Sequence, residues 1–170
     1  MKYILLFILL IPLLASCQAD KSALSKYPVQ VGDIVFDEKL DDKNFKKCNP
    51  KESYGYQYYN DSKGFGYKGE KLKIEKELEA LQLKSLGKEN GYITIRFLVN
   101  CEGKTGLFRI EEMNEEYLKT NFDEKFLDAL FKFTKNLNGW IPKEIQGKKI
   151  DYYQYLTFKI KHGEVSEILP

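Results

Sequence analysis

Histidine and arginine are scarce in this 170-residue chain, which contains one histidine, His162, and two arginines, Arg96 and Arg109. His162 follows the last long aromatic segment and has no cysteine or second histidine at the spacing of a zinc ligand set, so a zinc site is poorly supported. A Ser-His-Asp nucleophile is also poorly supported, because this single histidine lies beyond the last long strand candidate. We therefore predict no metal site and no cofactor.

An excess of charge of one sign is also missing. The chain has 27 basic and 25 acidic residues, and its formal net charge is +2. Such a balance gives no electrostatic case for binding nucleic acid or anionic lipid. Because only two of the basic residues are arginines, a basic recognition face is not expected, and we predict no nucleic-acid partner.

No apolar run in the chain is long enough to cross a membrane. The longest runs from Tyr3 to Leu14 and is interrupted by Pro12, whereas a spanning helix needs about 20 residues. Lys2 precedes this run and small residues follow it, which is typical of a secretion signal. The stretch Leu14-Ala15-Ser16-Cys17 resembles the lipobox of bacterial lipoproteins, in which the cysteine is acylated after cleavage. The alternative is an ordinary signal peptide with a chance cysteine.

The lipobox resemblance implies a protein anchored by lipid in the cell envelope of a Gram-negative bacterium. We favour the outer membrane, with the domain facing the periplasm. Residues 1–16 would then be the signal peptide, 17–26 a polar tether carrying the lipidated Cys17, and 27–170 a single domain. Two acyl chains hold a protein at a membrane far better than one, and no transmembrane helix is needed.

Cysteine is the next scarce residue, with three in the chain. If Cys17 is lipidated, Cys48 and Cys101 are the only thiols left in an oxidising compartment, and a disulfide is the simplest interpretation. In the chain-entropy model, closing this loop would stabilise the fold by roughly 4 kcal/mol. The alternative is a pair of buried free cysteines.

Apolar periodicity predicts both helices and strands in the domain. An apolar cluster at Ile34–Phe36 suggests one short strand, and alternating aromatics around an Asn-Asp-Ser-Lys-Gly turn suggest a hairpin. In the later segments, the apolar residues recur with the period of a helix in some and with the period of a strand in others. In chain order we expect an aromatic hairpin over 54–67, a helix over 70–82, a strand over 92–100, a strand over 106–110, a helix capped by Asn121 and ending near Leu137, and a long strand over 151–161.

The segment Asn100–Gly106, NCEGKTG, contains the GKT that ends a phosphate-binding loop. That motif requires a glycine five positions before Gly103, where this chain has Leu98, and a helix after Thr105. Because a strand is expected on each side, we interpret the segment as a hairpin turn in which glycine supplies conformational freedom.

The order strand, turn, strand, helix, Trp-Ile-Pro, Gly-Lys turn and long aromatic strand resembles the carboxy-terminal domain of the TonB family over about residues 90–162. The resemblance is carried by Gly91–Val99, Gly103 with Gly106, Phe126–Leu137, Trp140–Pro142, Gly147–Lys149 and Tyr155–Phe158. It implies a small α+β domain with a three-stranded antiparallel sheet and a helix packed on one face, here extended by the aromatic hairpin and the first helix. Family members of the transducer type have a proline-rich spacer before this domain. No such spacer lies between the lipobox and Tyr27 in this chain.

The family binds a segment of an outer-membrane transporter by adding it as a strand to the last strand of this unit. The resemblance therefore implies an envelope protein, such as an outer-membrane transporter, as partner, with Tyr153, Tyr155 and Thr157 beside the bound segment. The competing expectation is that the tail 164–170, or the amino-terminal extension, covers this edge.

Two functions remain open from the sequence. The first is a lipid-anchored protein-interaction module with a transport-associated role, which is not an enzyme. The alternative is a hydrolase of envelope polymers that uses paired carboxylates, for which Glu111-Glu112 and Glu115-Glu116 are the candidates.

Overall fold

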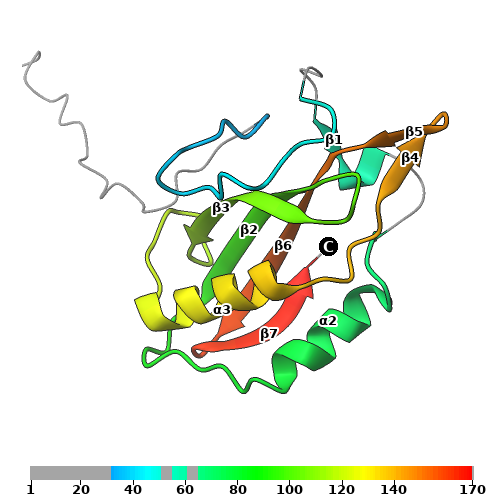
Figure 1. Ribbon diagram of the computed structural model, residues 1–170. Coiled ribbons are helices and arrows are strands. Elements are labelled where there is room, and N and C mark those ends of the chain that lie inside the picture. Colours follow the sequence, from blue (N-terminus) through cyan, green and yellow to red (C-terminus); the bar gives the residue numbers. More distant parts are fainter. Residues whose placement is uncertain (1–31, 51–54, 61–64, 170) are drawn as a thin grey trace, which may run out of the picture.

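The segment with the clearest apolar alternation, Gly91–Val99, forms the central strand β2 of a mixed sheet (Figure 1). The computed structural model describes residues 32–50, 55–60 and 65–169, and within them the fold is α+β. The elements are β1 (Tyr56–Gln57), η2 (Tyr58–Asn60), α2 (Glu70–Glu79), β2, β3 (Thr105–Met113), α3 (Glu124–Asn136), β4 (Lys143–Ile145), β5 (Lys148–Ile150), β6 (Tyr152–Lys161) and β7 (Glu164–Leu169).

The main sheet has five strands instead of the three expected. Strand β2 pairs antiparallel with β3 on one side and with β6 on the other, as expected for the three-stranded unit. Two further strands join β6 on its far edge, β1 in parallel and β7 antiparallel. The short strands β4 and β5 form a separate hairpin.

The predicted aromatic hairpin over 54–67 is wrong in the parts that the structure describes. Tyr56 pairs with Tyr152 of β6, and Tyr67 forms a bridge with Trp140, so neither pairs within the segment. Aromatic partners from elsewhere in the chain account for the difference. The ring of Tyr58 packs edge-on against Tyr155 at 5.1 Å, and that of Tyr67 lies 4.9 Å from Trp140.

Helix α3 covers one face of the sheet through an apolar stripe (Figure 1). Its buried residues are Phe126, Leu127, Leu130, Phe133 and Thr134. The helix begins two residues later than predicted, because Asp123 rather than Asn121 caps it by accepting a hydrogen bond from the Phe126 N–H at 2.9 Å. Helix α2 packs on the same side, with Ile74 and Leu78 in the core.

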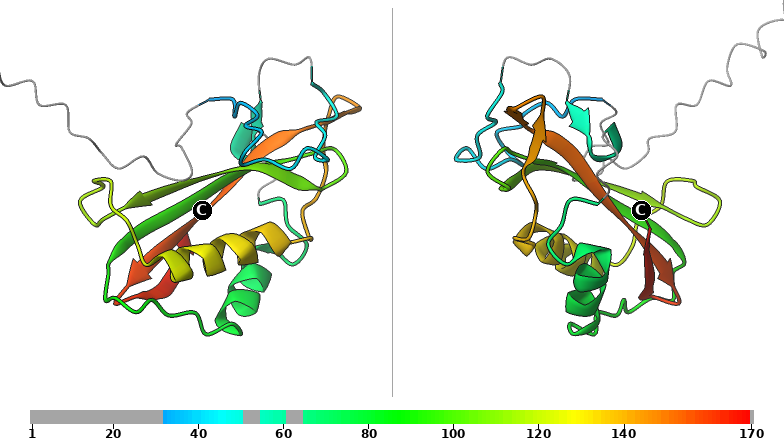
Figure 2. Two further views of the ribbon diagram at one scale, coloured as in Figure 1. Left: turned by 60° about the vertical axis from the view of Figure 1, so that its left-hand side comes forward. Right: turned by 90° about the vertical axis from the view of Figure 1, so that its right-hand side faces the viewer.

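Residues 32–50 cover the opposite face of the sheet, so the sheet is sandwiched between this segment and the helices (Figure 2). The short strand expected at Ile34–Phe36 does not form. Ile34 is instead buried as an isolated side chain against Leu98, Leu107 and Tyr153.

None of the helices in the described part of the chain is long and apolar enough to cross a membrane. The predicted signal peptide, the lipidated Cys17 and the tether lie outside the described residues.

Candidate functional site

The three residues predicted to flank a bound strand are engaged with the rest of the fold. Tyr153 is 1 % exposed and its hydroxyl accepts a hydrogen bond from the Ile34 N–H at 2.8 Å. The Thr157 hydroxyl lies 3.0 Å from that of Thr94. Burial, together with the hydrogen bond between the Tyr155 and Tyr58 side chains, raises the pKa of Tyr155 to about 12. These side chains therefore have structural partners already.

The far edge of β6 is largely occupied by other strands. Strand β1 pairs with Tyr152 and Tyr153, and β7 pairs with Thr157 to Lys161. Only residues 154–156 lie between these two strands, and there the Gln154 side-chain amide donates to the Tyr155 carbonyl at 3.0 Å. Both the tail and the amino-terminal extension cover the edge, so the open edge expected on β6 is not available.

The predicted disulfide is confirmed, because Cys48 and Cys101 are joined. The Asp151 carboxylate forms hydrogen bonds with main-chain groups on both sides of the bridge. It accepts hydrogen bonds from the Cys101 N–H at 3.1 Å and from the Asn49 N–H at 2.9 Å. The bridge thus ties the amino-terminal segment to the turn between β2 and β3.

The GKT segment is a hairpin turn, as predicted. The Asn100 side-chain oxygen accepts hydrogen bonds from the N–H groups of Glu102 and Lys104, and Gly103 has a φ of 79°. Gly106 serves a different purpose from the one expected, since a side chain there would collide with the ring of Phe45. It makes room for the amino-terminal segment.

The carboxylate pairs proposed for hydrolysis lie in or beside β3. Glu112 accepts a hydrogen bond from the Phe122 N–H at 2.7 Å, and burial raises its pKa. Its neighbour Glu111 points to the opposite face of the strand, because successive strand residues alternate. Glu115 accepts a hydrogen bond from the Asn90 side chain at 3.4 Å. Each of these hydrogen bonds stabilises a loop or the segment before a helix. None of them brings two of the carboxyl groups together as a general acid and base.

A groove that the sequence did not predict lies between α2 and β7. Its volume is about 670 Å³, which is within the range of small-molecule and cofactor sites. The lining residues are Glu75, Leu78, Glu79, Gln82, Leu83, Lys84, Glu164, Val165, Ser166, Glu167 and Ile168. An apolar floor and a charged rim are therefore combined beside the edge of a strand.

The groove is closed at both ends by contacts between its two walls. At one end Lys84 forms a bridge with Glu164, and the Ser85 N–H donates to the Gly163 carbonyl at 2.7 Å. At the other end the Lys71 ammonium donates to the Ile168 carbonyl at 2.8 Å. Between them, 165–167 has no main-chain partner on this side among the residues that the structure describes.

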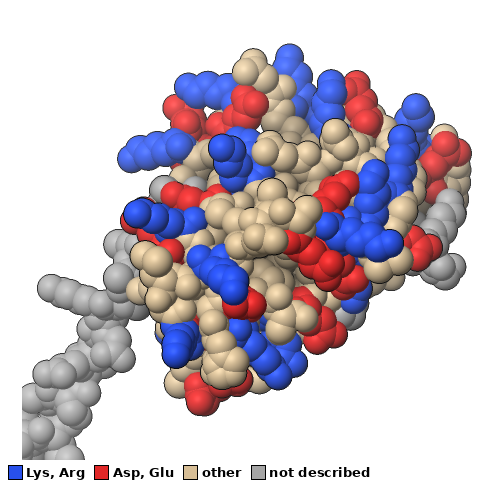
Figure 3. Space-filling view, turned by 90° about the horizontal axis from the view of Figure 1, so that it is seen from below, with Lys and Arg blue, Asp and Glu red and all other residues tan. Residues whose placement is uncertain are grey.

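The charged side chains around the groove are mostly acidic. Four of the lining residues are glutamates and one is a lysine. Lys84 pairs with Glu164 at 2.7 Å, and Lys71 lies 3.7 Å from Glu75. Within the described ranges, Glu79 and Glu167 have no ion-pair partner. Elsewhere on the underside of the molecule, basic and acidic side chains are interspersed (Figure 3).

The sequence indicated only one wall of this groove, because the tail 164–170 was considered as a segment that could cover the edge of β6. The bridge from 84–85 to the start of β7, which closes the groove, is a long-range contact with no local pattern.

No protein-family model matches this chain, and the comparisons with curated proteins and with solved structures found no match either.

Proposed function

We propose that this chain is a lipid-anchored protein-interaction module of the bacterial cell envelope, and that it binds a segment of a partner protein in the groove between α2 and β7. The observation that carries the proposal is the open stretch of β7 beside an apolar floor. An edge strand next to a helix offers main-chain groups for an extended segment and pockets for its side chains.

The arrangement of β2, β3, α3 and β6 supports a relationship to the TonB carboxy-terminal domain. The two antiparallel pairings of β2 and the helix on one face are the features that the resemblance implies. Because β1 and β7 occupy the edge of β6, strand addition in this protein would move one strand outward, to β7. A transport-associated role with an outer-membrane transporter as partner belongs to the same proposal.

The binding role is favoured over hydrolysis because the groove brings apolar side chains and a strand edge together, whereas Glu111 and Glu112 point to opposite faces. The chain would thus act without a cofactor, as a non-enzymatic module held at the membrane through Cys17.

Site-specific photocrosslinking in the native membrane tests the proposal. A crosslinker at Ser166, in the groove, should capture one defined segment of an envelope protein, identified by sequencing the crosslinked peptide. The same crosslinker at Glu144, in the hairpin of β4 and β5, is the control.

The charge reversal Glu79→Arg should reduce the crosslink at Ser166. Glu77→Arg is the matched control, because Glu77 lies on the same helix but outside the groove. A crosslink pattern that is the same from Ser166 and Glu144, and unchanged by Glu79→Arg, would overturn the proposal.

A further inference from the structure

We infer that the groove between α2 and β7 selects a short basic segment, in which lysine or arginine alternates with aliphatic side chains. The inference rests on the proposed function and specifies the partner's chemistry. The apolar side chains of the segment would contact the floor formed by Leu78, Leu83 and Val165. Its cations would meet the glutamates of the rim.

The balance of charge around the groove carries the first step. The protein's own lysines already approach two of the glutamates, Lys84 with Glu164 at 2.7 Å and Lys71 with Glu75 at 3.7 Å. Of the two other lining carboxylates, Glu79 on the helix has no ion-pair partner in the described part of the chain. Glu167 lies opposite Lys159 of β6, on the face of the sheet away from the core residue Ile168. An acidic segment would be repelled by Glu79, and a basic one would be attracted.

The second step is the position of Lys71. Its ammonium group lies at one end of the groove, where it donates to the Ile168 carbonyl at 2.8 Å and approaches the Glu75 carboxylate. A strand carbonyl and a helix carboxylate therefore already share one cation. Midway along the groove the same two kinds of group recur, the edge of 165–167 on β7 and Glu79 on the helix side. A cation from a partner would find an equivalent environment there.

The third step concerns length. Because 84–85 and Lys71 close the ends, the open edge is restricted to 165–167. Strand β7 also has an irregular register against β6 between Lys159 and Ile160, and bulges discourage long strand pairing. Main-chain pairing is thus limited to a few residues. Selectivity then comes from side chains, so that the charge of the segment decides its affinity.

Two fluorescent decapeptides that share one aliphatic pattern provide the test. One carries lysine and the other glutamate at the intervening positions, and fluorescence anisotropy measures their binding to the purified full chain. We expect the lysine peptide to bind up to about fivefold more tightly, as one exposed charge pair would give. Its affinity should fall as salt is raised.

The variant Glu79→Gln should lose most of this preference. The matched control is Glu77→Gln, which removes the same charge from the same helix outside the groove and should retain the preference. Equal binding of both peptides, or a preference that survives in the groove variant, would overturn the inference.

Failure of the inference can be told apart from failure of the proposed function. If neither peptide binds, but the Ser166 crosslink is specific and depends on Glu79, the basic-segment inference is wrong and the binding role stands. If the crosslink at Ser166 is also non-specific, both are wrong.

Discussion

The two faces of the sheet are covered in different ways. On one face, α2 and α3 pack through continuous apolar stripes, and the buried residues of α3 are almost all aliphatic or aromatic. On the other face, residues 32–50 have neither helix nor strand and contribute one small apolar cluster around Ile34. That segment is held by a disulfide and by hydrogen bonds and an ion pair at a few buried points.

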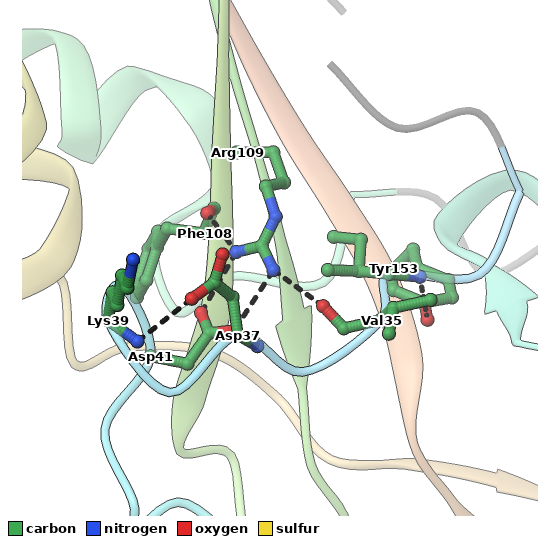
Figure 4. A network of polar contacts seen from close by, with 8 residues as sticks. Val35, Asp37, Lys39, Asp41, Phe108, Arg109 and Tyr153 are labelled. Atoms are coloured by element: carbon green, nitrogen blue, oxygen red, sulfur yellow. Dashed lines mark hydrogen bonds and ion pairs between the residues drawn. The ribbon is translucent and has the colours of Figure 1, made fainter. Parts of the chain in front are cut away.

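The main ion pair on the irregular face joins Arg109 of β3 to Asp41 (Figure 4). The guanidinium donates two hydrogen bonds of 2.9 Å to the carboxylate and a third, of 2.6 Å, to the Val35 carbonyl. Both side chains are 2 % exposed. The comparison indicates that the stability of the helical face comes from apolar burial spread over many residues. The stability of the irregular face comes from a few specific bonds, which substitutions can remove one at a time.

The largest effect is expected on the helical face. Phe126→Ala removes a side chain that is 2 % exposed and leaves a cavity, which should lower the free energy of unfolding by roughly 3–5 kcal/mol. Urea unfolding followed by circular dichroism measures it. Leu72→Ala, at a position 58 % exposed on α2, is the control and should change stability by less than about 0.5 kcal/mol. Similar losses from both would contradict the importance of the apolar stripe.

Removing the disulfide is the next largest change. Cys48→Ser/Cys101→Ser opens a loop with a sequence separation of 53, and stability should fall by at most about 4 kcal/mol in the chain-entropy model. Hydrogen exchange should increase mainly in residues 32–47, whereas α3 should keep its protection. Equal loss of protection on both faces would show that they do not differ as described.

The buried ion pair gives a smaller effect. Arg109→Met leaves the Asp41 carboxylate buried without its cation, at a cost of about 3 kcal/mol. The double variant Arg109→Met/Asp41→Leu should recover most of this loss, because the uncompensated charge is then gone. Denaturant midpoints of the single and double variants measure both. If the double variant is no more stable than the single one, the pair itself stabilises the segment.

The pH dependence of the same pair is the smallest expected effect. Burial alone would raise the pKa of Asp41, but the hydrogen bonds from Arg109 and the Asp37 N–H, with the Arg109 charge, lower it below its usual value. A depressed carboxyl pKa contributes stability above the unfolded-state pKa of about 3.9, and this stability is lost as the pH falls through the folded pKa.

Urea midpoints between pH 5 and pH 2 measure that loss. The wild type should lose more stability on acidification than Arg109→Met/Asp41→Leu. If the urea midpoints of the two proteins fell equally with pH, this carboxylate would not couple folding to pH.

The helical face could be predicted from the sequence because its signals are local. The stripe from Phe126 to Leu137 and the alternation of Gly91–Val99 correctly indicated a helix and a central strand. The helix start was misplaced, since Asn121 and Asp123 are both capping residues and only the fold selects between them. The helix expected over 70–82 ends at Glu79, so that Leu81 lies beyond it and is 50 % exposed.

The irregular face and the candidate groove depend on long-range contacts and were not predictable in the same way. Cysteine counting identified the disulfide, but nothing near Asp41 in the sequence indicates Arg109 as its partner. Likewise, the tail was recognised as a possible strand on β6, but the groove it forms with α2 depends on a bridge between Lys84 and Glu164 that spans half the domain.

If the chain is held at its amino-terminal end, as we propose, the disulfide has a mechanical consequence. A pulling force applied there would first load residues 32–47 and then reach Cys48, where the covalent bond transfers it directly to Cys101 in the turn between β2 and β3. The detachment of residues 32–47 from the sheet would stop at that point. The segment before Cys48 could thus extend and retract under load as a short spring, while the sheet and the groove on its far side keep their shape.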